Sequence, residues 1–314
     1  MTATLAITER RGQGTWPSLP LSEWKDSLDT LHRCLQIVGK TRLALSAPLN
    51  HWWHVTLYLT ARGLTTSPIP YGVRSFEVDL DFIDHNLLIR TNEGATRALA
   101  LVPRTVADFY REYTGLLDSL GFRIKLRPIP SEMEDTEAFT DDRRHFAYDP
   151  DYVSRCWKIL SRSDRVFQQF RGRFLGKCSP VHFFWGGFDL ACTRFSGRSA
   201  PPHPGGVPNI PDWAVREAYS HECISVGWWP GGGPLAEASF YSYCYPEPAG
   251  FGQAMVQPDG AYYHPELREF ILPYDAVRLA PNPEKTLLQF LQTTYEAGAT
   301  LGQWDRRALE RPQE

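Results

Sequence analysis

The sequence predicts an α+β protein made of two similar lobes, each an antiparallel sheet packed with helices. Helical and strand-like patterns alternate along both halves of the 314-residue chain, and this length suits two domains. An acidic, proline-flanked and weakly patterned stretch separates the halves. We therefore expect an N-terminal lobe over 16–130, a linker over 131–149 and a C-terminal lobe over 150–306.

The N-terminal half contains patterns of both kinds. Ser22 is a suitable N-cap, and apolar residues recur at helical spacing from there to Gly39, which we expect to end the helix. The segment 51–60 is rich in aromatic and β-favouring residues and predicts a strand. Apolar and acidic residues alternate over 76–82, which indicates a strand with one solvated face. A helix over 105–120 and a strand over 122–130 complete the lobe.

The C-terminal half begins with a long helix that Pro150 opens and Gly176 ends. Further elements are predicted as strands over 181–195, 219–229, 238–245 and 268–279 and a helix over 283–301.

The two halves resemble each other in the order of their motifs. In each half a Gly-Lys pair precedes a histidine followed by two aromatic residues, at His51 and at His182. An arginine follows eleven or twelve residues later, at Arg62 and at Arg194. This order indicates an internal duplication of one α+β unit. Coincidence between short matches is the alternative.

Composition narrows the class of protein. The net charge is −3 and the basic residues are scattered, which argues against a nucleic-acid partner. The chain has neither an N-terminal apolar signal region nor an 18-residue uncharged apolar run, so we expect no membrane span. Six widely spaced cysteines without a CxxC pair are typical of reduced thiols, and the expected location is cytoplasmic. The composition does not predict an oligomeric state.

Four of the nine histidines lie in a stretch dense in glycine, proline and aromatic residues: His182, His203, His221 and His264. Imidazole titrates near neutral pH and is a common metal ligand. We therefore predict a site at which His182, His221 and His264 hold a zinc, iron or copper ion. Ordinary hydrogen-bonded core histidines are the competing interpretation, because no HExxH or HxH spacing is present.

Strand alternation suggests which side chains share this site. Period-two spacing from Val181 puts His182 and Arg194 on one face and Asp189 on the other, unless the Gly186-Gly187 pair forms a bulge. On this pattern Arg194 would bind an anionic substrate group.

His221 and Glu222 are neighbours that would serve as ligands or as an acid–base pair, although on a strand they point apart. With His182 and Arg194 they form the predicted catalytic set. His203 lies in a proline- and glycine-rich loop suited to covering a site. His203, Trp185 and Tyr262 are the predicted contacts to a ligand or cofactor.

Several long motifs resemble a bacterial family catalogued only as a domain of unknown function. They are WPSLP at residue 16, NHWW at 50, RGLTTSPIPYG at 62, GKCSPVHFFWG at 176, APPHPGG at 200 and YYHPE at 262. The resemblance extends over residues 16–306. It implies a soluble bacterial protein and supplies no reaction and no catalytic residue.

The leading functional hypothesis is an enzyme that acts on a small molecule in an aromatic, histidine-lined pocket of the C-terminal lobe, with assistance from a metal ion as an option. The alternative is a non-catalytic binder of a flat ligand or cofactor, in which aromatic rings stack on the ligand. A third hypothesis is an oligomeric scaffold without a pocket.

Overall fold

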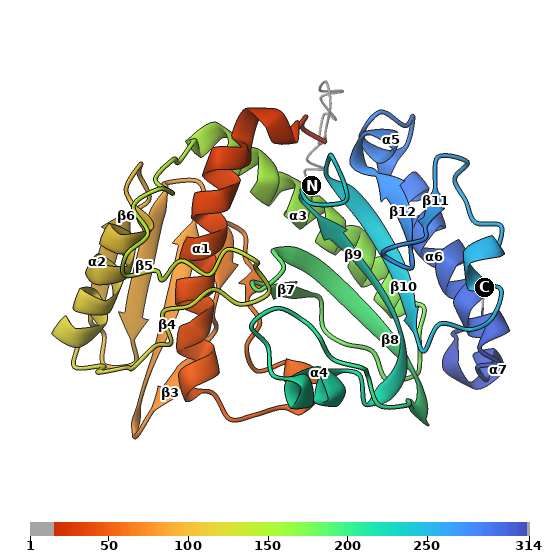
Figure 1. Cartoon of the computed structure of the whole chain (residues 1–314), viewed down its shortest axis with the longest axis horizontal. Coiled ribbons are helices and arrows are strands. Elements are labelled where there is room, and N and C mark those ends of the chain that lie inside the picture. Colours follow the sequence, from red (N-terminus) through yellow and green to blue (C-terminus); the bar gives the residue numbers. More distant parts are fainter. Residues whose placement is uncertain (1–15, 313–314) are drawn as a thin grey trace, which may run out of the picture.

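The structure, a computed structural model, describes residues 16–312. It confirms the α+β class, because the described residues form two antiparallel six-stranded sheets and seven α-helices (Figure 1). The first sheet is ordered β1-β2-β4-β5-β6, with β3 paired to β4, and the second is ordered β11-β12-β10-β9-β8-β7.

The strands of the first sheet are β1 (Tyr58–Leu59), β2 (Gly63–Thr65), β3 (Ile69–Tyr71), β4 (Arg74–Asp81), β5 (Asn86–Thr91) and β6 (Thr96–Ala100). The strands of the second sheet are β7 (His182–Phe184), β8 (Asp189–Ser199), β9 (His221–Trp229), β10 (Ser239–Tyr245), β11 (Tyr262–His264) and β12 (Glu269–Pro273). The α-helices are α1 (Leu21–Leu45), α2 (Val106–Ser119), α3 (Pro150–Gly172), α4 (Asp212–Ala218), α5 (Tyr274–Arg278), α6 (Pro283–Leu301) and α7 (Arg306–Leu309). Two 3-10 helices, η1 (Asn50–Trp52) and η2 (Phe251–Gln253), complete the described elements.

The helices cover one face of each sheet. In the first sheet Phe76, Val78 and Leu80 of β4 are buried on the helix side, which confirms the strand with one solvated face. The helices α3 and α6 contact each other and the same face of the second sheet. The opposite face of the second sheet is therefore free of α3 and α6, and the short helix α4 lies beside it (Figure 1).

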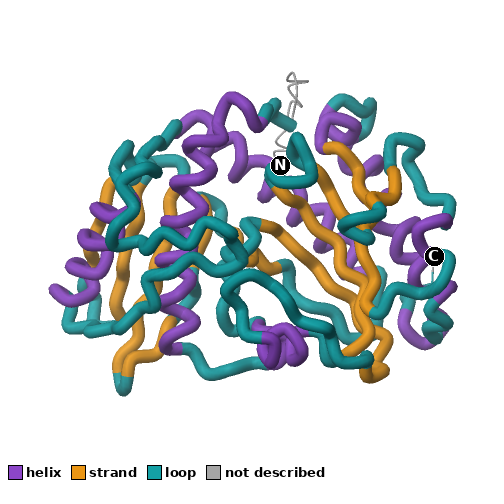
Figure 2. The backbone as a smooth tube through the Cα atoms, viewed as in Figure 1, coloured by secondary structure: helices purple, strands orange, loops and turns teal. Residues whose placement is uncertain are grey.

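The two sheets meet at their edges. Leu57, just before β1, and Phe183 of β7 exchange two backbone hydrogen bonds of 2.9 Å. The buried apolar residues form one cluster that extends through both sheets. Two long loops, 121–149 and 200–211, run across the centre of the molecule beside α1 and the second sheet (Figure 2).

The segment predicted as a linker, 131–149, is not fully exposed, because Phe139 and Asp142 within it are 0% accessible. The lobe boundaries at 130 and 150 stay a prediction.

Several predicted elements differ from the structure. The helix α1 continues past Gly39 to Leu45, because a glycine inside a helix is tolerated where a neighbouring ring needs the space. The segment 51–60 begins as a 3-10 helix in which His51 and Trp52 have positive φ, so the strand there is only two residues long. His51 and His182, equivalent in the duplication hypothesis, thus lie in different local structures.

Three other predicted elements also differ from the structure. Residues 122–130 form no strand. The long helix from Pro150 ends at Gly172, before the predicted Gly176. The segment 268–279 is strand only to Pro273, where α5 begins. The predicted helices over 105–120 and 283–301 are confirmed by α2 and α6. Within residues 16–312, no helix combines the length and apolar character needed to cross a bilayer.

Candidate functional site

A cavity of about 680 Å³ lies on the face of the second sheet that α3 and α6 leave free. It is bounded by the second half of α1, by η1 and by the segments 125–132 and 207–219. We call this space the site cavity. Its volume is in the range of small-molecule sites. The aromatic residues that line it are Trp52, Trp53, Phe184, Trp185, Phe195, Trp213, Tyr219, Tyr241 and Tyr243.

The floor of the site cavity is formed by β8, β9 and β10. Gly227 of β9 is paired with Tyr241 of β10, and a Cβ atom on Gly227 would lie 2.2 Å from the Tyr241 ring. Glycine at this position therefore lets the tyrosine lie across the sheet. From there the Tyr241 hydroxyl donates a hydrogen bond of 2.5 Å to Oδ2 of Asp189.

Asp189 reaches the site cavity because of the β7–β8 hairpin. Phe184 pairs directly with Asp189, so His182 and Phe184 lie on the same face as Asp189. Uninterrupted strand alternation is therefore wrong, and the exception left open for the Gly186-Gly187 pair applies, in the form of a turn. The turn at 185–188 resets the phase of the alternation, which brings Asp189 onto the His182 face and puts Arg194 on the opposite face.

The side chain of Glu132 lies over this turn. A Cβ atom on Gly186 would be 2.0 Å from Glu132 Oε1, so only glycine leaves room for the carboxyl group. Gln36 of α1 holds the two segments together. Its amide donates to the carbonyls of Ser131 at 2.8 Å and Gly186 at 3.2 Å, and its Oε1 accepts from the Ser131 amide at 2.7 Å. Gln36 is thus a positioning residue for Glu132.

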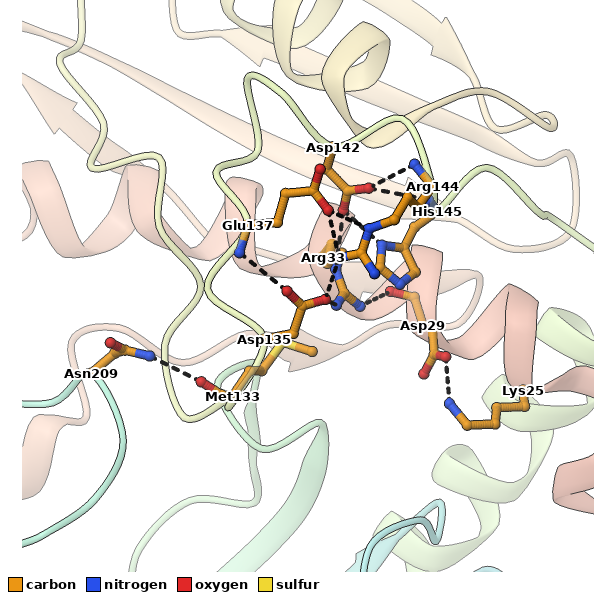
Figure 3. Close-up of polar contacts among 10 residues, drawn as sticks. All are labelled: Lys25, Asp29, Arg33, Met133, Asp135, Glu137, Asp142, Arg144, His145 and Asn209. Atoms are coloured by element: carbon orange, nitrogen blue, oxygen red, sulfur yellow. Dashed lines mark hydrogen bonds and ion pairs between the residues drawn. The ribbon is translucent and has the colours of Figure 1, made fainter.

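Ion pairs fix the rest of the 131–149 segment on α1 (Figure 3). The guanidinium group of Arg33 is 2.7 Å from Asp135 and 3.2 Å from the fully buried Asp142. Asn209, in the loop on the other side, donates a 2.9 Å hydrogen bond to the carbonyl of Met133. The segment that carries Glu132 is therefore bonded to α1 and to the 200–211 loop.

Glu132 and Asp189 form a close carboxyl pair. A Cβ atom on Gly187 would lie 3.1 Å from Asp189 Oδ1 and 3.6 Å from Glu132 Oε2, so these oxygens are separated by no more than the sum of the two distances. Glu132 is exposed as a residue. Desolvation of its carboxyl group beside Gly186, then the charge of Asp189, raises the pKa of Glu132 to about 7, although Lys40 opposes the shift. Burial raises the pKa of Asp189 to about 6, although the Tyr241 hydrogen bond opposes it. The negative charge of Asp189 disfavours ionisation of the nearby Glu132 carboxyl group.

Lys40 brings a cation to the same part of the site cavity. It is only 4% exposed, and its Nζ donates a 2.8 Å hydrogen bond to the Ser131 hydroxyl. Burial, followed by the charge of Arg127, lowers the pKa of Lys40 to about 8, against the opposing effect of Glu132. Gln36 and Lys40 are one helical turn apart, so one face of α1 presents both to the 131–132 segment.

The predicted residue His182 is buried behind the cavity wall and does not line it. Its ring lies 5.5–5.6 Å from the rings of Trp53, Tyr58 and Phe184, and neither ring nitrogen has a hydrogen-bond partner among the described residues. Burial, then the nearby charge of Arg42, lowers the pKa of His182 to about 3. The imidazole is therefore neutral over the physiological range.

The histidines predicted to share a metal ion do not meet. His221 is exposed at the start of β9, and His264 lies on the edge strand β11, where its Nδ1 accepts from the Leu267 amide at 3.3 Å. Glu222 is paired with Arg198 at 2.7 Å, outside the site cavity. No group of three metal-ligating side chains occurs within residues 16–312. The expected centre of His182, His221 and His264 is thus not formed there.

Of the three predicted ligand contacts, Trp185, His203 and Tyr262, only Trp185 lines the site cavity. Trp185 is 4% exposed and lines the site cavity, and its indole NH donates to the Val55 carbonyl at 2.6 Å. His203 stacks on Tyr219 with 4.7 Å between ring centroids, so it lies behind a lining residue. Tyr262 is 45% exposed on the edge strand β11.

Arg194, predicted to bind an anion, faces the helices. Its side chain is 0% exposed, and the guanidinium carbon lies 3.4 Å from the Phe170 ring centroid and 4.2 Å from that of Tyr295. A cation held between aromatic rings in this way is an element of the core. Arg194 therefore does not reach the site cavity.

Comparison with known families agrees with the resemblance in the sequence. A model described as a family of unknown function (DUF5996) matches residues 16–311. The chain belongs to this family. The match includes both sheets and every residue of the site cavity, so the cavity lies within the part of the chain that defines the family. The chain matches no curated protein and no solved structure.

The residues that the sequence reasoning missed include Gln36, Lys40 and Glu132, and regular alternation put Asp189 on the wrong face. Glu132 lies in a segment without periodicity, and no pattern connects it to α1. The adjacent glycines Gly186 and Gly187 were the available indication, because paired glycines within a strand mark a turn or the close approach of another group.

Proposed function

We propose that the protein is an enzyme that binds a small molecule in the site cavity and transfers protons through Glu132 and Asp189. The observation that carries this proposal is the pairing of the two carboxyl groups, both with pKa values raised towards neutrality, at the wall of a cavity of about 680 Å³. Raised and separated carboxyl pKa values in a cavity are the usual property of an acid and a base that work together.

The two carboxyl groups take different roles. Glu132, with the higher pKa of about 7, is protonated on a substantial fraction of molecules at neutral pH and acts as the acid. Asp189, with a pKa of about 6, is mostly ionised and acts as the base, held in place by the Tyr241 hydroxyl. Trp185 and the other lining rings bind the apolar part of the substrate.

Non-catalytic binding of a flat ligand is the second candidate function. The aromatic walls of the site cavity support it. Trp52 of η1 and the exposed Trp213 of α4 both line the cavity, and the centroids of their rings are 5.4 Å apart. In this case the carboxyl groups would only hydrogen-bond the ligand.

One experiment separates the two functions. The small-molecule fraction of a cell extract is incubated with the wild-type protein, with Glu132→Gln and with Glu134→Gln, and the compounds are followed by mass spectrometry. We expect at least one compound to be converted by the wild type and by Glu134→Gln, because Glu134 is exposed and lies outside the site cavity. Glu132→Gln should bind that compound without converting it.

Retention of a compound by the wild-type protein without any Glu132-dependent conversion would refute the enzymatic proposal and favour the binder. Conversion that persists in Glu132→Gln would refute the role of the carboxyl pair.

A further inference from the structure

The site cavity also has a basic wall. Lys40, Lys125 and Arg127 line it, whereas Glu132 and Asp189 are its acidic residues, so cations outnumber carboxyl groups. Lys125 and Arg127 are two residues apart in the extended segment that leads to Glu132, and both are exposed.

Within residues 16–312 these cations form no ion pair, although the charge of Glu132 acts on Lys40. No ion pair or side-chain hydrogen bond joins Lys125 or Arg127 to another described residue, and Lys40 donates only to the Ser131 hydroxyl. A buried ammonium group is normally paired with an anion. The 4% exposed Lys40 is instead directed to a hydroxyl beside an open cavity.

Aromatic residues of the cavity lining would bind an apolar part of the ligand. Trp52, Trp53 and Trp213 supply flat apolar surface, and Trp213 is 60% exposed. Its surface is available to a ring that enters the cavity.

We infer that the substrate class is an aromatic compound that carries an anionic group, such as a carboxylate or phosphate, with Lys40, Lys125 and Arg127 binding the anion and the tryptophans binding the ring. The inference rests on the proposed function for the identity of the cavity as the substrate site. It assigns to these three residues the anion recognition that the sequence pattern suggested for Arg194. Arginine and lysine bind such groups through charge-assisted hydrogen bonds.

A matched pair of fluorescent probes tests this inference. 1-Anilinonaphthalene-8-sulfonate carries an anion, and N-phenyl-1-naphthylamine has the same rings without it. Dissociation constants for both probes are measured by probe fluorescence with the wild type, Lys40→Met, the double variant Lys125→Gln/Arg127→Gln and Trp213→Ala. Arg97→Gln is the control, because it removes an exposed charge on β6 that is absent from the cavity lining.

We expect Lys40→Met and the double variant Lys125→Gln/Arg127→Gln to weaken binding of the sulfonate roughly tenfold or more, because each loses charge-assisted contacts. The neutral probe should keep its affinity in every variant that removes a charge, and Arg97→Gln should change the affinity of neither probe. Replacement of Trp213 by Ala should weaken both probes.

Equal weakening of both probes by the charge variants, or sulfonate binding that neither charge variant changes, would overturn the inference. Because neither probe is converted, the result is independent of proton transfer. Anion recognition can fail while Glu132-dependent conversion persists, and the reverse outcome is equally visible.

Discussion

Replacement of Asp189 by Asn is expected to slow conversion of the substrate by about 10²–10⁴-fold, the usual contribution of a positioned general base. The amide has nearly the same shape and can still accept the hydrogen bond that the Tyr241 hydroxyl now donates at 2.5 Å. It cannot take up a proton. The turnover rate should therefore fall while the affinity for the substrate stays close to that of the wild type.

Single-turnover kinetics on the compound found in the extract experiment measure this loss. Asp118→Asn is the matched control, because Asp118 is exposed on α2 and does not line the site cavity. A rate for Asp189→Asn within a few-fold of the control rate would exclude Asp189 as the base.

Replacement of Gly39 by Ala is expected to destabilise the protein, although alanine is the better helix former. A Cβ atom at position 39 would lie 2.3 Å from Cδ1 and Nε1 of Trp185. The indole cannot retreat easily, because it is 4% exposed and bonded to the Val55 carbonyl. Overpacking of this severity costs up to about 3 kcal/mol and helix propensity returns about 1 kcal/mol, so we expect a net loss of about 2 kcal/mol.

Urea unfolding gives the free energy of unfolding for this comparison. Gly115→Ala in α2 is the control, because no described atom outside the adjacent residues and the backbone of α2 lies within 4 Å of its added Cβ. That variant should gain up to about 1 kcal/mol. Equal stabilisation by both substitutions would show that Trp185 does not rest against Gly39.

The elements with long periodic patterns could be predicted from the sequence. The helices α2, α3 and α6 begin at capping residues or prolines that the sequence displays. The side chains of Thr105 and Asn282 accept hydrogen bonds from the first turns of α2 and α6. The strand β4 has the expected alternation. These features depend on neighbours in the chain, which a sequence pattern records directly.

The candidate site depends on contacts between distant segments. Glu132 approaches Asp189 only because Gln36, about 95 residues earlier in the chain, binds both the Ser131 backbone and the hairpin turn at Gly186. No local propensity encodes that arrangement. The hairpin turn also reversed the face assigned to Asp189, since one change of phase moves every later side chain to the other side of a strand.

The predicted convergence of the histidines failed because it also depended on contacts between distant segments. Their density in the sequence suggested convergence, but a sheet of this order separates His221 on β9 from His264 on the edge strand β11. Imidazoles on strands of one sheet lie close together only if their strands are adjacent and their side chains share a face.

The pairing of Glu132 with Asp189 is tested most directly by carboxyl-carbon NMR titration of the labelled protein. The account predicts that Glu132 titrates near pH 7 and Asp189 near pH 6. It also predicts that Asp189→Asn lowers the pKa of Glu132, because a neighbouring negative charge is removed. Titration of both groups near their ordinary values of about 4, with no response of Glu132 to Asp189→Asn, would contradict it.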